Sequence, residues 1–153
     1  MEKQHYLSKA MAYCSKAEHC VSDLNQKMMQ WEVPESFRDD IIAALMEENF
    51  INEERYAAAF VNDKIKFNRW GRKKVRYALR QKQVPASFID YALGNVNLDE
   101  YKSILQQVLG SKCEEKNSDD PRFREKVVRA LLTKGFEYDL ISECYDKITD
   151  NQR

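Results

Sequence analysis

"LNQKMMQWEVPESFRDDIIAAL" (residues 24–45) reappears in altered form as "VRYALRQKQVPASFIDYALGNV" (75–96). A Val-Pro pair, and the Ser and Phe that follow it, recur at a constant offset of 51 residues. In both copies apolar residues recur every three or four positions on each side of the Pro, which is typical of two amphipathic helices joined by a tight turn. The pattern therefore predicts a repeated helix-turn-helix unit.

A third copy, "VVRALLTKGFEYDLISECYDKI" (127–148), follows 52 residues further on, with Gly135-Phe136 where the second copy has Gln83-Val84. Another helical segment precedes each copy, at about 5–18, 52–68 and 98–110. The sequence thus predicts an all-α protein of three tandem three-helix repeats, stacked into an elongated array. The expected repeats are residues 1–51, 52–96 and 97–153.

Local signals refine the third repeat. Asn97 with Glu100 is typical of a helix N-cap, and Asp120-Pro121 predicts another helix start. The tract "SKCEEKNSDD" (111–120) is polar and without apolar period. We therefore expect a flexible loop there.

The composition excludes several classes of protein. No run of eighteen apolar residues occurs and the amino terminus lacks a signal-peptide pattern, so we expect a cytoplasmic protein with no membrane contact. The four cysteines form no CxxC unit, and we expect reduced thiols. A metal site at Cys14, His19 and Cys20 is disfavoured because zinc usually takes four closely paired ligands. We expect no metal and no cofactor.

Charge is distributed unevenly along this chain of zero net charge. Residues 1–51 carry a formal charge of −4, residues 52–94 carry +6 and residues 95–153 carry −2. Within the positive part, "KFNRWGRKKVRYALRQKQVP" (66–85) holds eight Lys or Arg and no Asp or Glu. Because salt screens charges beyond about 8–10 Å, a partner would sense this local field and not the total.

The basic stretch separates into faces. On a helix over 72–82, Val75, Ala78 and Leu79 share an apolar side. The opposite side carries Lys73, Arg76, Tyr77 and Arg80. Like-charged neighbours repel by about 0.2–0.5 kcal/mol per pair, and a helix selected only for solubility would mix in Glu. We therefore predict an interaction surface and not merely a solvated face.

The preceding helix adds to this surface. Tyr56, Ala59, Phe60 and Phe67 are expected on its inward side, whereas Arg55 and Lys66 lie about 90° away. Gly71 allows a sharp turn, or a Gly N-cap, between the two helices. Both basic groups could then face one groove.

Direct reading of DNA bases is disfavoured, because the second helix of each helix-turn-helix pair is acidic or nearly uncharged. Binding through phosphates would be strongly salt-dependent and indifferent to sequence.

No P-loop, GxSxG or HExxH motif occurs. The acidic pairs Asp39-Asp40 and Glu47-Glu48 are expected to face solvent. We predict a protein that is not an enzyme.

The segment "NEERYAAAFVNDKIKFNRWGRKKVRYALRQKQVP" (52–85) closely resembles the central part of the RecX family, bacterial modulators of the RecA recombinase. The matching elements are Glu54-Arg55-Tyr56-Ala57, Phe60-Val61, Gly71, Leu79, Lys82 and Val84, with Gln83 in place of the usual Gly. "KAMAYCSKAEHCVSDLNQKM" (9–28) is similar to the opening helices of the family and "DPRFREKVVRALLTKGFEYDLI" (120–141) to its closing ones.

The resemblance implies a curved, non-enzymatic array that lodges in the groove of the RecA–DNA filament and suppresses its ATPase, strand-exchange and co-protease activities. It thereby implies a role in DNA repair, homologous recombination and the SOS response, for a monomer. Tyr56, Phe60, Gly71 and Leu79 are implied to be scaffold. The predicted binding residues, for DNA phosphates or RecA carboxylates, are Arg55, Lys66, Arg69, Arg72, Lys73, Arg76, Tyr77 and Arg80.

Two alternatives stay open. The chain could be a nucleic-acid-binding helical-repeat protein of low specificity that acts independently of RecA. It could also be an adaptor that uses apolar or acidic faces and ignores DNA.

Overall fold

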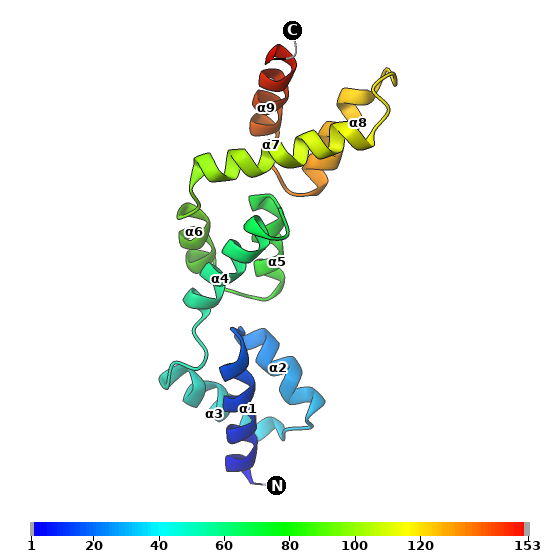
Figure 1. Cartoon of the computed structure of the whole chain (residues 1–153). Coiled ribbons are helices and arrows are strands. Elements are labelled where there is room, and N and C mark those ends of the chain that lie inside the picture. The colour runs from blue at the N-terminus through cyan, green and yellow to red at the C-terminus, as the bar shows by residue number, and fades with distance from the viewer. Residues whose placement is uncertain (1, 152–153) are drawn as a thin grey trace. The chain divides into compact units, whose positions relative to one another are not determined.

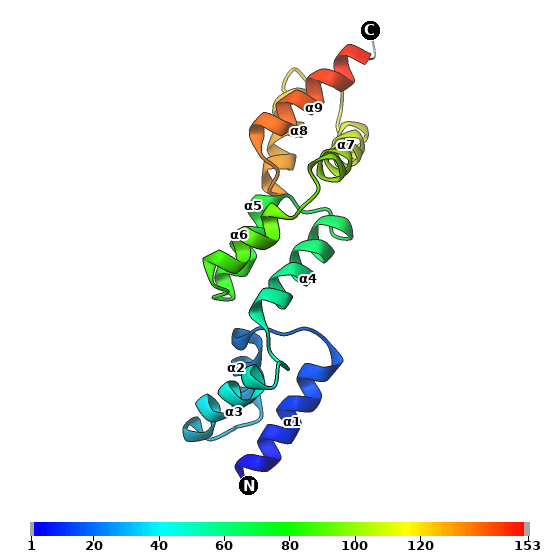
Figure 2. The same cartoon turned by 90° about the vertical axis from the view of Figure 1, so that its left-hand side faces the viewer.

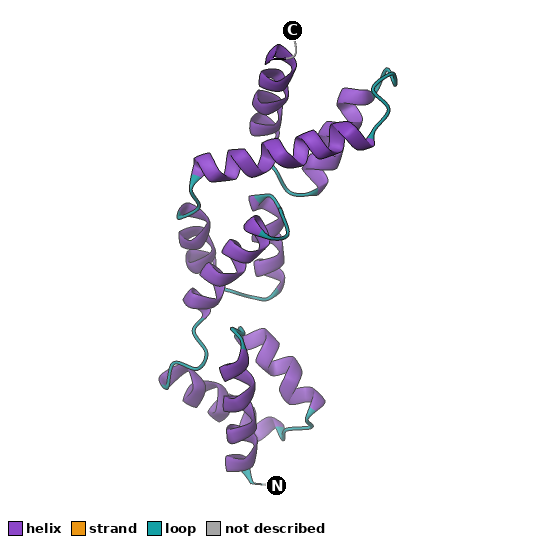
Figure 3. Cartoon of the chain, viewed as in Figure 1, coloured by secondary structure: helices purple, strands orange, loops and turns teal. Residues whose placement is uncertain are grey.

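The computed structural model describes residues 2–151. Within these residues the chain forms nine α-helices and no strands, which confirms the all-α prediction (Figures 1 and 3). The helices are α1 (Lys3–Lys16), α2 (Val21–Gln30), α3 (Glu35–Glu47), α4 (Glu53–Lys66), α5 (Arg72–Gln81), α6 (Ala86–Gly94), α7 (Leu98–Glu115), α8 (Phe123–Thr133) and α9 (Tyr138–Asn151).

The chain divides into two compact units. The first contains the chain up to Ala59 together with Leu79–Asp90, and the second contains Phe60–Ala78 together with the chain from Tyr91 onward. The helices α4, α5 and α6 therefore each contribute residues to both units.

In the first unit, α1 and α2 both pack against α3, as Figure 1 shows. The apolar residues that face inward recur at helical spacing, so burial of these side chains is what holds the short helices together. This core consists of Ala10, Cys14, Leu24, Met28, Val33, Ile41, Leu45 and Ile51.

In the second unit, α7, α8 and α9 pack on one another in all three pairings (Figure 2). Tyr101 and Phe136 are the largest fully buried side chains, and their rings lie 5.5 Å apart between centroids. The other buried residues of these helices include Leu105, Leu109, Val127, Leu131 and Ile141.

The turns inside the three repeats share one backbone geometry. Glu32, Gln83 and Gly135 each adopt a positive φ, of 58°, 61° and 97°. In each turn the next residue donates its N–H back to a carbonyl in the last turn of the preceding helix. This is the Schellman arrangement, which satisfies carbonyl groups that a helix end leaves unpaired.

Several local predictions are corrected. The segment 111–115, expected to be loop, continues α7 to Glu115, because Gly110 is tolerated inside the helix and Lys112 pairs with Glu115 at 3.2 Å. The helix expected at Pro121 begins at Phe123. The predicted N-cap is confirmed, since the Asn97 side chain accepts the N–H of Glu100 at 3.0 Å.

The inward face predicted for α4 is wrong at its end. Phe67 is 77 % exposed, because α4 ends at Lys66 and the chain turns away before the ring could reach a core. The buried positions of this helix are Tyr56, Ala57, Val61 and Ile65.

Candidate nucleic-acid interface

The helix α5 has the two faces that its periodicity predicts. Val75 and Leu79 are completely buried. Lys73, Tyr77 and Arg80 are exposed on the opposite side of the same continuous helix, with Tyr77 65 % exposed. Arg76 is half-buried and has an interaction partner within the chain. Among the described residues, no carboxylate forms an ion pair with Lys73 or Arg80.

The first turn of α5 carries three cations, Arg72, Lys73 and Lys74, and no acidic residue. A helix N-terminus is the positive end of the macrodipole, so each cation there is unfavourable by about 0.3–1 kcal/mol. Local choices that oppose stability are expected at functional surfaces. The charges on α5 are therefore better explained by binding than by helix formation.

The N-terminal backbone groups of α5 are not available to a ligand. Gly71 N–H donates to the Lys134 carbonyl at 2.8 Å and Lys73 N–H donates to the Gly135 carbonyl at 3.0 Å. Between them, Arg72 N–H donates to the Tyr101 hydroxyl at 3.0 Å. Any anion at α5 must therefore be bound by side chains.

The close approach of the backbone at the start of α5 to the backbone of Gly135 and Phe136 requires glycine at position 71. A Cβ atom at Gly71 would collide with the backbone of Gly135 and Phe136. The glycine that the sequence suggested as a turn residue or an N-cap thus lets two backbones touch.

Arg72 belongs to the scaffold. Its guanidinium is 2.5 Å from the Glu137 carboxylate and lies 4.5 Å from the centroid of the Tyr101 ring. The Tyr101 hydroxyl donates to the other oxygen of Glu137, also at 2.5 Å. Burial, together with this hydrogen bond, raises the pKa of Tyr101 above its ordinary value, so the hydroxyl stays a donor. These contacts give Arg72 a structural role, and its binding role stays a prediction.

Arg55 also has partners within its own unit. Its Nε donates to Glu18 at 2.6 Å, and its Nη2 donates to the Asn49 carbonyl at 3.1 Å. These bonds tie the start of α4 to the segment before α2 and to the end of α3. The guanidinium thus has a structural role in its own unit, and its binding role stays a prediction.

Lys66 and Arg69 are exposed in the second unit, where α4 ends and the turn to α5 begins. Arg69 has a φ of 56°, a left-handed conformation that directs the turn. For these two residues, and for Lys73, Arg76, Tyr77 and Arg80, the binding role stays a prediction.

Two basic residues of the second unit were missed, Lys112 on α7 and Lys134 at the end of α8. Burial, with the charges of Lys112, Lys74 and Arg69, lowers the pKa of Lys134. Lys134 and Lys74 are neighbours although 60 residues separate them in the sequence, since a Cβ atom at Gly135 would collide with Lys74. Helical periodicity carries no signal for such a contact.

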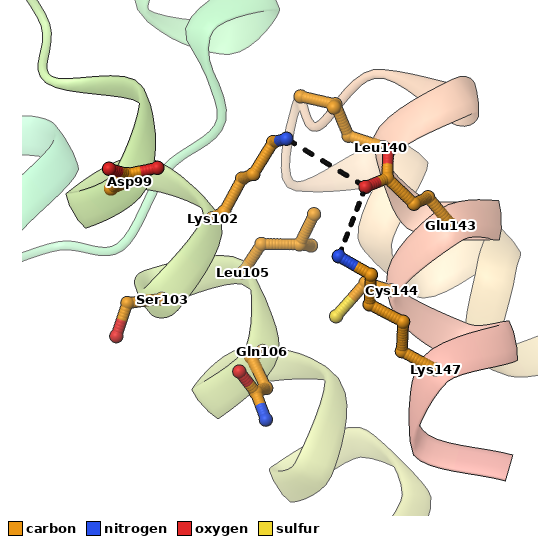
Figure 4. Close-up of a pocket in the computed structure, with 9 residues that line it drawn as sticks. All are labelled: Asp99, Lys102, Ser103, Leu105, Gln106, Leu140, Glu143, Cys144 and Lys147. Atoms are coloured by element: carbon orange, nitrogen blue, oxygen red, sulfur yellow. Dashed lines mark ion pairs between the residues drawn. The ribbon is translucent and has the colours of Figure 1, made fainter. Parts of the chain in front are cut away.

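A hollow between α7 and α9 does not form a ligand site (Figure 4). Its volume is about 180 Å³, below the 300–1,000 Å³ or so of usual ligand pockets. Lys102 and Lys147 both reach Glu143, at 3.7 and 3.2 Å, so the charges around the hollow largely cancel.

The described residues contain neither a cluster of metal ligands nor a helix that could span a membrane. No three His, Cys, Asp or Glu side chains among them are placed to hold a metal ion. Burial raises the pKa of Cys14 to about 11, so its thiol stays protonated. None of the described helices is both long and apolar enough to cross a membrane.

Comparison with known proteins identifies the family. Two family models match, the second three-helix domain of RecX over residues 52–93 and the third over residues 99–145. The regulatory protein RecX of Leuconostoc mesenteroides is 32 % identical over 147 residues, which cover 95 % of this chain and 55 % of that protein. For RecX of Clostridium perfringens the identity is 27 %, over 85 % of this chain and 62 % of the relative. The chain thus spans little more than half the length of these relatives.

Solved structures agree. A crystal structure of regulatory protein RecX matches 94 % of this chain and 71 % of its own, with a TM-score of 0.87 and 26 % identity. RecX from Lactobacillus salivarius shares the fold, with a TM-score of 0.84, 21 % identity and 96 % coverage of both chains. These matches confirm the tandem three-helix organisation, while the predicted repeat boundaries and curvature stay predictions. The chain belongs to the RecX family.

Proposed function

We propose that this chain regulates the RecA recombinase, most simply as an inhibitor, by binding the RecA–DNA filament through the outer face of α5. The binding residues are Lys66, Arg69, Lys73, Arg76, Tyr77 and Arg80. The chain acts by binding alone and without catalysis, in the cytoplasm and as a monomer. Family membership and the relatives' name, regulatory protein RecX, support this proposal.

The observation that carries the proposal is the exposed cationic face of α5. Lys73 and Arg80 extend into solvent on either side of Tyr77, and α5 contains no acidic residue to neutralise them. Phosphates of the DNA in the filament, or carboxylates of RecA, are the groups that such a face attracts. A protein bound to these phosphates or carboxylates hinders the conformational changes that the RecA filament makes during each cycle of ATP hydrolysis.

The test is RecA-dependent ATP hydrolysis on single-stranded DNA, with this protein titrated in. Wild type should inhibit, and Lys73→Glu combined with Arg80→Glu should abolish the inhibition. The double variant should fold normally, because Glu in the first turn of α5 gains about what Glu in its last turn loses.

The matched control is Arg129→Glu with Lys147→Glu, which changes the net charge equally at exposed positions on α8 and α9. This control should inhibit as wild type does. Inhibition that survives Lys73→Glu and Arg80→Glu would exclude the α5 face. DNA binding by wild type without any effect on RecA at equimolar protein would favour the nucleic-acid-binding protein that acts alone.

A further inference from the structure

A second group of cations in the second unit is built around Trp70. The Nζ atoms of Lys64 and Lys74 lie 4.9 and 4.4 Å from the centroid of the Trp70 ring. Phe60 meets the same ring edge-on at a centroid distance of 6.5 Å. Trp70 thus holds two lysines from different helices beside one aromatic surface.

The end of α8 lies against this group. The Lys134 carbonyl accepts the N–H of Gly71, the residue after Trp70, at 2.8 Å. A Cβ atom at Gly135 would collide with the backbone of Lys74. Lys134 is therefore adjacent to Trp70 and Lys74 through the backbone, whatever rotamer its side chain adopts.

The charges of two more cations also act on Lys134. The charges of Lys112 and Arg69 act on Lys134 together with that of Lys74, after burial itself. We name Lys64, Lys74 and Lys134 the Trp70 cluster. Of the carboxylates described, Glu115 opposes these charges at Lys134, and it already pairs with Lys112 at 3.2 Å.

Packing alone does not explain the Trp70 cluster. A lysine over an indole is stabilised by a cation–π contact, but its charge remains and repels its neighbours. Three lysines from α4, α5 and the end of α8, held close together, are a ready site for a polyanion.

Phe67 indicates which polyanion fits. Its ring is 77 % exposed in the turn that also carries Arg69 and Trp70. An exposed aromatic ring among cations is the arrangement by which proteins bind single-stranded nucleic acid, since unpaired bases stack on the ring while lysines contact the phosphates. An acidic protein segment would engage the cations but leave Phe67 unused.

We infer that the Trp70 cluster and Phe67 form a second binding surface, for single-stranded DNA, on a different side of α5 from Lys73 and Arg80. The inference rests on the proposed function only for the choice of DNA as the polymer. The phosphate chain runs over the lysines and a base stacks on Phe67.

The test uses the full chain without RecA, with a labelled oligothymidylate and fluorescence anisotropy over a range of salt. Lys74→Gln with Lys134→Gln keeps both aliphatic stems and removes two charges. It should weaken binding at least tenfold near 0.1 M salt and reduce the salt slope by about 1.4, the amount expected for two lost phosphate contacts on a single strand. Phe67→Ala should weaken binding about 5- to 100-fold and leave the salt slope unchanged.

The matched control is Lys102→Gln with Lys147→Gln, which removes two lysines of the same unit that share Glu143 (Figure 4). This control should bind as wild type does. A second readout comes from Trp31→Phe, which leaves Trp70 as the only indole of the two in the chain. Its fluorescence should change on titration with oligothymidylate, and after Lys74→Gln and Lys134→Gln the change should need at least tenfold more oligothymidylate.

Unchanged affinity and salt slope in Lys74→Gln with Lys134→Gln would overturn the inference. The inference would also be overturned if wild type did not bind oligothymidylate but bound polyglutamate through Lys74 and Lys134. The partner would then be an acidic protein. Because RecA is absent from this assay, its outcome is independent of RecA inhibition through Lys73 and Arg80.

Discussion

The turn at 82–84 and the turn at 134–136 have the same backbone hydrogen bonds but different residues at the left-handed position. Gln83 N–H donates to the Arg80 carbonyl at 2.9 Å, and Gly135 N–H donates to the Leu132 carbonyl at 3.0 Å. Gln83 is exposed with a φ of 61°, whereas Gly135 is buried with a φ of 97°. A repeat of one sequence pattern has thus placed one turn in water and the other inside a unit.

What holds each turn in place explains the difference. The Gly135 turn is attached backbone to backbone, at Gly71 and Lys73. The Gln83 turn is attached by a side chain, since Lys82 Nζ donates to Asp23 of α2 at 2.7 Å. A left-handed residue therefore needs to be glycine where another backbone touches it, and a side chain is tolerated where only water does.

Of the substitutions at these two turns, Gly135→Ala should lower the stability of the chain most. The methyl group would collide with Lys74 and approach the Gly71 carbonyl, at a φ that is already unfavourable for alanine. Overpacking costs about 1–3 kcal/mol and the conformation about 1–2 kcal/mol more, so we expect the free energy of unfolding in urea to fall by about 3 kcal/mol. Gln83→Ala is the control and should change it by less than about 0.5 kcal/mol. Equal effects at the two positions would contradict the explanation.

The helices and turns could be predicted from the sequence because they depend on local periods. The spacing of apolar residues by three or four positions, the Pro after the turn in the first two repeats and the Asn97 cap all act within a few residues of the chain. The extension of α7 could not be predicted, since Gly110 weakens a helix without ending it. Burial of Phe67 was predicted wrongly because its spacing continues the period of α4, whereas the helix ends one residue before it.

The candidate site could be predicted in part for the same reason. Periodicity shows which face a cation occupies, so Lys73 and Arg80 were placed outward. It does not show what that cation meets. Arg55 and Arg72 find carboxylates 37 and 65 residues away in the sequence, contacts that only the tertiary structure reveals.

Asp23→Asn should weaken the attachment of the Gln83 turn by an intermediate amount. Burial disfavours the Asp23 carboxylate, but its bond to Lys82, with smaller contributions from Cys20 and His19, outweighs this and lowers the pKa of Asp23. We expect the variant to lose about 1 kcal/mol of unfolding free energy near neutral pH, as is usual for a partly exposed charged hydrogen bond.

The pH dependence gives this prediction a sign. An acid whose pKa is lowered by folding binds fewer protons in the native state, so its stabilisation is complete above the unfolded pKa and disappears as pH falls through the folded value. Wild type should exceed Asp23→Asn in stability at about pH 5, and the two should converge by about pH 2. A difference that stays constant over this range would mean that the charge of Asp23 does not matter.

Gln83→Gly should have the smallest effect on the free energy of unfolding, and it tests most directly whether glycine is dispensable at an exposed turn. Glycine removes the left-handed penalty of about 1 kcal/mol or more, but it also makes the unfolded chain more flexible, at a cost of about 0.5–1 kcal/mol. We therefore expect a gain of about 0.5 kcal/mol, or about 1–2 °C in Tm by calorimetry. Glu32→Gly, at the equivalent exposed turn with a φ of 58°, should give the same gain. If Gln83→Gly destabilised the chain while Glu32→Gly stabilised it, the Gln83 side chain would have to make a contact of its own, and exposure to water would no longer explain why glycine is dispensable there.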